Sequence, residues 1–549
     1  MTEPFQVAVV GAGPAGLTAA VHAAAGGVSV VLIDAGARPG GQYWRHHGPG
    51  LGADERAGHH DWRAFAALRD ALQAHIDAGR VHYLARAQVV LLHPGTPFLM
   101  HLTGATGDAP PVPYVVAATD LILCPGGYDR QLPVPGWDLP GVMAAGGVQA
   151  LLTGSRTLPG KRAVIAGTGP FLLPVAAGFA AAGGEVVAVC EANSPLRWAR
   201  QAHRAAQAPG KGREALGYLT TFARHKIPYR PRTVLTRVLG DSEVGGAVLA
   251  KVDPTGRVVP GTSREVEADL VAFGWGFTPS LELLLAVGAK TRLDADGSLV
   301  VAVDADQATS VPRVRAAGEA TGVGGAALAR LEGELAARSL VADATGKPLR
   351  ARALRRRIRR LRTFAQAMHA AHPIPASWAQ WLTDDTLVCR CEEVPVAAVR
   401  NAIGNLGATD PRTVRSLTRV GMGWCQGRIC ASACARLVAG LTNGALTADA
   451  LQATSSRAFA APLELSRVAR LDAPSTPERA CPPLLERRRA AWAFSPHPVN
   501  ELRPFPKAHD NGRTVTDGWY LAHTDFSACL EHRPEILRNV TQRGHLVSS

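Results

Sequence analysis

A strand, a glycine-rich turn, a helix and a second strand ending in an acid occupy the first 34 residues. Apolar Gln6–Val10 runs into Gly11-Ala12-Gly13-Pro14-Ala15-Gly16, and a second apolar run ends at Asp34. This order is the pattern of a dinucleotide-binding βαβ unit, because its glycines allow a tight turn, close backbone approach to a pyrophosphate and close helix–strand packing. The helix N-terminus offers free N–H groups to phosphates, and Asp34 can accept hydrogen bonds from a ribose.

The same logic repeats further along the chain. The strand Lys161–Ala166 leads into Gly167-Thr168-Gly169, and a later strand ends at Glu191. A glutamate there suits a ribose 2′-OH and favours NAD over NADP. Leu172 stands where the third glycine is expected, so the second site is predicted to hold NAD, another adenine nucleotide or nothing.

Four cysteines form two close pairs late in the sequence. Cys389 and Cys391 make a Cys-x-Cys, and 33 residues later Cys425 and Cys430 make a Cys-x₄-Cys. Four thiolates of this kind suit a [2Fe–2S] cluster or a structural Zn²⁺ ion. Cys434 falls outside the pattern and is predicted to be a buried thiol.

Composition excludes several classes of protein. Hydrophobic residues make up 47% of the chain, which is ample for buried cores, and the net charge is +14 without a nucleic-acid-binding motif. We predict no transmembrane segment and no signal peptide, and therefore a cytoplasmic protein. Residues 350–362 carry eight arginines around a thin apolar stripe, which predicts either a solvated linker helix or a docking surface for an acidic partner.

Three more segments resemble the two-dinucleotide-domain flavoproteins of the glutathione-reductase type. They are Pro39-Gly40-Gly41-Gln42, Leu121–Gly127, and Ala316–Gly322, in which Glu319 replaces the family's aspartate. The resemblance implies FAD in the first site, and it places an acid at 319 beside the flavin's ribityl chain. No cysteine pair lies near the flavin segments, so a flavin–dithiol relay is not expected. The predicted FAD residues are Gly11, Gly13, Pro14, Ala15, Gly16, Asp34, Gly41, Gln42, Gly126, Gly318 and Glu319; those of the second site are Gly167, Gly169 and Glu191.

The cysteine segments Val388–Val394 and Gly421–Cys430 resemble the bacterioferritin-associated-ferredoxin (BFD) type of [2Fe–2S] domain. That resemblance implies Cys389, Cys391, Cys425 and Cys430 as the cluster ligands.

The sequence therefore predicts an α/β two-dinucleotide-binding-domain flavoprotein with a small helical [2Fe–2S] BFD-like domain and an irregular C-terminal tail. The predicted domains are an FAD-binding domain (1–155 and 279–345), a second nucleotide domain (156–278), an Arg-rich helical linker (346–384), the [2Fe–2S] domain (385–450) and an extended tail (451–549).

This domain order resembles the larger flavoprotein chains of opine oxidases, of hydrogen cyanide synthases and of dye-linked proline or hydroxyproline dehydrogenases. The resemblance implies an electron-transfer subunit of a complex that oxidises C–N bonds. An amine-oxidase-like flavoprotein subunit would do the oxidation, and a small ferredoxin-like subunit is a further implied partner. The alternatives are a self-contained NADH-dependent flavin reductase and a non-enzymatic assembly subunit. No catalytic residue is predicted.

Overall fold

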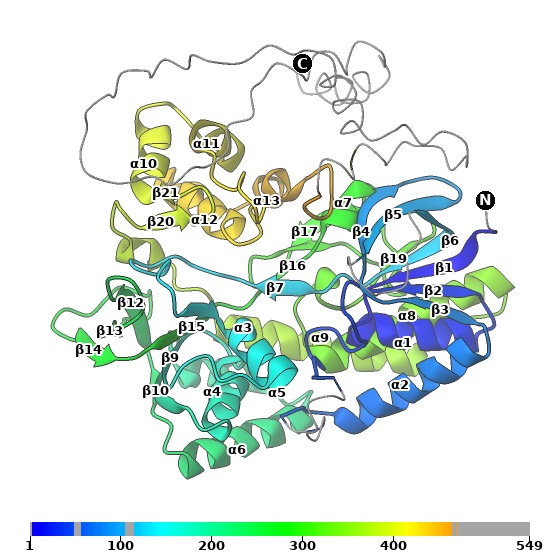
Figure 1. The fold of residues 1–549 in the computed structure, drawn as a ribbon, viewed down its shortest axis with the longest axis horizontal. Helices are drawn as coiled ribbons and strands as arrows, with labels where there is room; N and C mark the ends of the chain where they lie inside the picture. Colours follow the sequence, from blue (N-terminus) through cyan, green and yellow to red (C-terminus); the bar gives the residue numbers. More distant parts are fainter. Residues whose placement is uncertain (1–2, 49–55, 57, 105–114, 464–467, 469–549) are drawn as a thin grey trace, which may run out of the picture. The chain divides into compact units, whose positions relative to one another are not determined.

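A seven-stranded sheet forms the first nucleotide-binding domain in the computed structural model, which describes residues 3–48, 56, 58–104, 115–463 and 468 (Figure 1). Its strand order is β3-β2-β1-β6-β5-β4, with β19 paired to β6. The central strands β1 and β2 are almost wholly apolar because helices or other strands cover both of their faces. The strands are β1 (Phe5–Val10), β2 (Val30–Ile33), β3 (Val81–Leu84), β4 (Ala87–His93), β5 (Phe98–Gly104), β6 (Val115–Leu123) and β19 (Val314–Ala316).

Two helices pack closely on this sheet. Helix α1 (Pro14–Ala25) lies against α8 (Ala326–Thr345), and α2 (Trp62–Asp77) covers α1 from the other side (Figure 1). Gly333 of α8 makes the close approach, because a Cβ there would lie 2.0 Å from the backbone oxygen of Ala15. The N-terminal turn of α1 is therefore held in place by a helix from the far end of the domain.

The second nucleotide-binding domain has a five-stranded parallel sheet in the order β11-β10-β9-β15-β8. A three-stranded antiparallel sheet, β12-β13-β14, adjoins it. The strands are β8 (Val142–Ala144), β9 (Arg162–Gly167), β10 (Glu185–Glu191), β11 (Tyr229–Pro231), β12 (Thr233–Leu239), β13 (Gly246–Lys251), β14 (Arg264–Glu267) and β15 (Leu270–Gly274). The helices are α3 (Ala145–Ala150), the π-turn η2 (Leu151–Ser155), α4 (Leu172–Ala181), the 3₁₀ turn η3 (Pro195–Gln201), α5 (Ala202–Ala205) and α6 (Pro209–Arg224).

Two short antiparallel strands connect the two nucleotide-binding domains. These are β7 (Gly127–Asp129), which leaves the first domain, and β16 (Phe277–Pro279), which returns to it. The returning chain then forms α7 (Glu282–Ala286), β17 (Thr291–Leu293), β18 (Leu299–Val301) and the 3₁₀ turn η4 (Gly318–Thr321).

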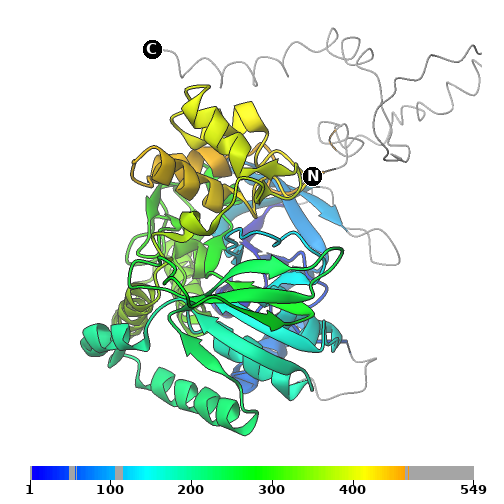
Figure 2. The ribbon, with the colours of Figure 1, turned by 90° about the vertical axis from the view of Figure 1, so that its left-hand side faces the viewer.

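The region from residue 352 to 463 is mostly helical. Helix α9 (Arg352–Ala371) packs on α8, and the cysteine-bearing segment follows with its helices gathered beside the strands of the second domain (Figure 2). The elements are η5 (Trp378–Trp381), β20 (Leu387–Cys389), β21 (Val394–Pro395), α10 (Val396–Gly404), α11 (Pro411–Thr418), α12 (Ala431–Leu441) and α13 (Ala448–Ser455). Helix α13 crosses the predicted boundary at residue 451, and the tail predicted from residue 466 onward lies outside the described residues except for Val468.

One apolar core joins the cysteine-bearing domain to the second nucleotide-binding domain. Trp137 and Trp275 share it with Trp381 and Val388. The indole N–H of Trp137 donates to the oxygen of Leu387 at 2.7 Å, and that of Trp381 donates to the oxygen of Gly256 at 3.0 Å. Among the described residues, no helix combines the length and the apolar character needed to cross a bilayer.

Candidate functional site

The first glycine turn has the geometry that a pyrophosphate site requires. Gly11 adopts a φ of 95°, and a Cβ there would lie 2.3 Å from the oxygen of Cys124. A Cβ on Gly16 would lie 1.8 Å from the oxygen of Gly11. Helix α1 begins at Pro14 with no side chain capping it, so its first N–H groups face outward with the positive end of the helix dipole.

Asp34 is fixed beside this turn. Its Oδ1 accepts the N–H of Ala12 at 2.9 Å, and its Oδ2 accepts the N–H of Gly36 at 3.1 Å. Burial raises the pKa of Asp34, and the two backbone hydrogen bonds partly offset that rise. The side chain stays partly exposed. Its remaining lone pairs can therefore accept ribose hydroxyls from solution.

The loop that carries Gly41 and Gln42 closes over the turn. Gly41 has a φ of 60°, and a Cβ there would lie 2.7 Å from the Cα of Gly13. Gln42 is exposed and accepts a hydrogen bond from Arg45 at 2.7 Å. Gly126 also has a left-handed φ of 72°, with open space where a Cβ would lie.

Glu319 supplies an acceptor at the far end of this groove. Its Oε1 accepts the N–H of Gly325 at 3.1 Å, while its Oε2 is shielded from solvent and has no partner within the described residues. Burial raises the pKa of Glu319 to about 7. An orphan carboxylate oxygen next to Gly318, whose φ is 81°, fits the hydroxyls of a flavin side chain. The residues present therefore fit FAD.

Two residues that sequence reasoning missed hold this turn from behind. Buried Glu332 accepts the N–H of Gly318 at 3.0 Å and the hydroxyl of Thr321 at 3.1 Å. Arg362 of α9 donates to Glu332 at 2.8 Å and to the oxygen of Gly322 at 2.6 Å. In the sequence, Arg362 is one of eight similar arginines and carries no signal of its own.

The second glycine turn is built more for packing than for binding. A Cβ on Gly167 would lie 1.9 Å from the oxygen of Gly274 in the neighbouring strand. Leu172, in the place of the third glycine, is buried and lies where a Cβ on Gly274 would come within 2.8 Å of it. Gly169 has a φ of 100° and open space around it.

The acid of the second site has no lone pair left for a ribose. Glu191 is 1% exposed, and its Oε1 accepts the hydroxyl of Thr168 and the N–H of Asn193, both at 2.9 Å. Its Oε2 accepts the N–H of Gly169 at 2.8 Å and lies 3.3 Å from the Nδ1 of His372, at the end of α9. The amide of Asn193 also donates to the oxygen of Pro373 at 2.9 Å. The role predicted for Glu191, binding the ribose of NAD, therefore does not fit this arrangement.

The four predicted cluster ligands come together. Cys430 forms side-chain hydrogen bonds with Cys389 and Cys425, and Cys425 forms one with Cys391. The hydrogen bond with Cys430 is the main factor that lowers the pKa of Cys389 to about 6 and that of Cys425 to about 5, and backbone N–H groups assist in both cases. N–H groups aimed at sulfur favour thiolates and therefore metal ligation.

Glycines let the two cysteine loops approach each other. A Cβ on Gly423 would lie 2.5 Å from the Cβ of Cys391, and Gly421 has a φ of 79°. The described residues contain no group of three or more His, Cys, Asp or Glu side chains placed around one ion position. The linked row of sulfurs thus suits a two-iron core better than a single tetrahedral Zn²⁺ ion.

One ligand faces solvent and the others lie further inside. Cys391 is exposed, and beside it Trp424 is 84% exposed, whereas Cys389 and Cys430 are buried. Cys434 is buried as predicted, and burial raises its pKa to about 12.

The flavin segments and the cysteine loop meet at the connecting strands. Tyr128 follows the Gly126 turn by two residues and lines a small pocket with Gly427 and Arg428 of the cysteine loop. Arg428 forms an ion pair with Glu282 of α7, with 3.0 Å between Nε and Oε1. The chain leaving the FAD segment thus reaches the loop between Cys425 and Cys430.

Comparison with known proteins agrees with this geometry. Residues 5–337 match the family model of the pyridine nucleotide-disulphide oxidoreductases. The chain belongs to that family. Residues 387–439 match the BFD-like [2Fe-2S] binding domain. FAD and a [2Fe–2S] cluster are therefore the cofactors of this oxidoreductase, and the resemblance predicted from its motifs is confirmed.

Several curated relatives are subunits by name. Hydrogen cyanide synthase subunit HcnB of Pseudomonas aeruginosa is 30% identical over 431 residues, which are 78% of this chain and 91% of that protein. The A-type subunit of opine oxidase from Agrobacterium tumefaciens is 31% identical over 459 residues, which are 79% of this chain and 85% of that protein. The crystal structure of L-proline dehydrogenase from P. horikoshii shares the fold, with a TM-score of 0.59, 18% identity and coverage of 85% of this chain and 80% of that one.

Proposed function

We propose that the chain is the electron-transfer subunit of a multi-subunit dehydrogenase that oxidises C–N bonds in amino acids, imino acids or opines. The observation that carries the proposal is the meeting of the Gly126–Tyr128 segment with the loop between Cys425 and Cys430. When bound, the flavin takes up two electrons at once and the cluster releases them singly.

Each group of residues then has one task. The turn from Gly11 to Gly16 binds the pyrophosphate, Asp34 holds the ribose, and Glu319 orients the flavin's side chain through its free oxygen. Cys389, Cys391, Cys425 and Cys430 hold the iron. The exposed edge at Cys391 is where single electrons leave the protein, because electron transfer between proteins needs close approach to the redox centre.

The geometry weighs against the self-contained NADH-dependent reductase. A reductase of that kind must bind NADH, and the acid meant for its ribose is saturated by Thr168, Gly169, Asn193 and His372. The relatives named above are subunits, which supports a separate partner chain for the oxidation step.

Rapid mixing of the purified, cofactor-loaded chain tests the proposal. Alone, it should show flavin and [2Fe–2S] absorbance, little turnover of proline or opines, and slow bleaching of the flavin by NADH. When the co-purified partner and its substrate are added, both centres should be reduced in sequence. Full substrate turnover by the lone chain, or NADH bleaching as fast as catalysis, would refute it.

A further inference from the structure

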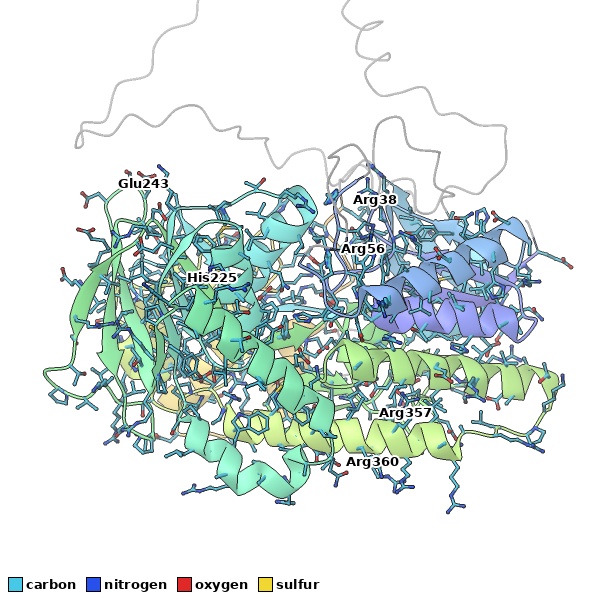
Figure 3. The ribbon with its side chains drawn as sticks, turned by 90° about the horizontal axis from the view of Figure 1, so that it is seen from below. Arg38, Arg56, His225, Glu243, Arg357 and Arg360 are labelled. Atoms are coloured by element: carbon cyan, nitrogen blue, oxygen red, sulfur yellow. The ribbon has the colours of Figure 1, made fainter. Side chains whose placement is uncertain are left out.

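Helix α9 has an outer face made of arginine. Arg352, Arg356, Arg357, Arg359 and Arg360 are all exposed, and on an α-helix these positions fall within an arc of about 160°. Figure 3 views the molecule from below and shows Arg357 and Arg360 on the outer side of this helix. Within the described residues, none of the five side chains has a carboxylate or a hydrogen-bond acceptor as a partner.

The other arginines of α9 are matched to acids. Arg355 forms an ion pair with Asp306 at 2.5 Å, and Arg362 forms one with Glu332 at 2.6 Å. Both lie beside the buried stripe of Leu354 and Ile358 that packs on α8. The arginines that face the protein are thus neutralised by it, and only those that face outward are not.

No acid relieves the outer face from nearby in the sequence. Residues 344–383 contain nine lysines and arginines and neither glutamate nor, apart from the one residue Asp384 just beyond, aspartate. The adjoining α5 and η3 contact α9, where Trp198 stacks on Phe364 with 5.8 Å between ring centroids, and they add exposed Arg200 and Arg204. Like charges one turn apart, as at 352, 356 and 360, destabilise a helix, so nothing within the described fold gains from this arrangement.

We infer that this arginine face, defined by Arg352, Arg356, Arg357, Arg359 and Arg360, docks an acidic surface of a partner protein subunit. Charge complementarity carries the inference, and guanidinium groups bind carboxylates through paired hydrogen bonds that a lysine cannot match. A membrane fits less well, because the face offers only Ala353 between its arginines and no large apolar side chain to insert. Nucleic acid is the other polyanion that the test must separate.

The position of α9 makes this contact consequential. Its inner face holds the flavin turn through Arg362, and its C-terminal end reaches Glu191 through His372. A partner bound to the outer face would therefore rest on the helix that braces the FAD segment. The inference rests on the proposed function only in needing a partner subunit, and not on what that subunit oxidises.

A charge reversal with a matched control tests the docking surface. The pair Arg356→Glu and Arg360→Glu changes the outer face, whereas Arg63→Glu and Arg257→Glu make the same charge change at exposed positions on α2 and on the loop after β13. Tagged full-length chain is expressed in its source organism, the co-purifying subunit is identified and purified, and its affinity for each cofactor-loaded variant is measured between about 50 and 300 mM NaCl.

We expect the outer-face variant to bind the partner about tenfold or more weakly, with a shallower salt dependence, while the control stays within about twofold of wild type. If the variant loses flavin or melts early, Arg356→Gln with Arg360→Gln should give a smaller loss of the same sign. Equal affinity of all variants, or recovery of the tagged chain alone, overturns the inference. So does binding of a DNA duplex or of anionic phosphatidylserine vesicles that the reversal abolishes while the partner's affinity is unchanged. Substrate oxidation by the reassembled wild-type complex is scored separately and reports on the proposed function.

Discussion

Replacing Gly333 by alanine should weaken both folding and flavin binding. The new Cβ would lie 2.0 Å from the oxygen of Ala15 and 2.8 Å from its carbonyl carbon, so α1 and α8 must separate by roughly 1 Å. Overpacking of this kind costs about 1–3 kcal/mol, and a clash between two backbones belongs in the upper part of that range. Alanine returns about 1 kcal/mol through its higher helix propensity, which leaves a net loss of about 1–2 kcal/mol.

Gly217→Ala provides the matched control. Gly217 lies within the exposed helix α6 with no atom within 4 Å of its virtual Cβ, so the same substitution should stabilise the protein by up to about 1 kcal/mol. The difference between the two variants then measures the clash alone. Urea midpoints and the flavin-to-protein absorbance ratio are the assays. If Gly333→Ala matches Gly217→Ala in midpoint and binds a full complement of FAD, this glycine does not position the pyrophosphate turn.

Three further outcomes are expected. Cys391→Ser should abolish the [2Fe–2S] absorbance and electron paramagnetic resonance signals while FAD remains, whereas Cys434→Ser should keep both; an intact cluster in the first variant would remove Cys391 from the ligand set. Because burial raises the pKa of Glu319 to about 7 and flavin hydroxyls donate to its ionised form, FAD affinity should rise as the pH increases through 7, by up to about tenfold per pH unit, and Glu319→Gln should flatten that dependence in FAD titrations. Because Glu191 is saturated by internal partners, calorimetric titration with NADH should show no binding in the range from micromolar to about 1 mM, and tight binding would contradict this interpretation of the second site.

Local chemistry explains what the sequence could predict. The turn at Gly11–Gly16, the acid at Asp34 and the two cysteine pairs depend on residues close together in the chain, where spacing alone restricts the geometry. Their neighbours in space depend on distant segments. Glu332 and Arg362 support the flavin turn from two later helices, and nothing in their surroundings in the sequence marks them.

The second site shows the same limit from the opposite side. Its strand, glycine turn and acid are typical of a nucleotide site, and the altered position at Leu172 is the one local sign of change. The saturation of Glu191 comes in part from His372, which lies 181 residues later in the chain and arrives only because α9 packs across the domain. Patterns within one βαβ unit carry no information about such a contact.

The tryptophan-rich core shared by Trp137, Trp275, Trp381 and Val388 has a consequence for how this molecule can be dissected. A ferredoxin-like module cut out at residue 385 would leave half of its interior behind and expose the rest to water. The second nucleotide-binding domain, with its ribose acid already engaged, therefore persists as the foundation on which the iron-binding loops are built. Any lineage that discarded it would also have to rebuild the floor beneath its metal centre.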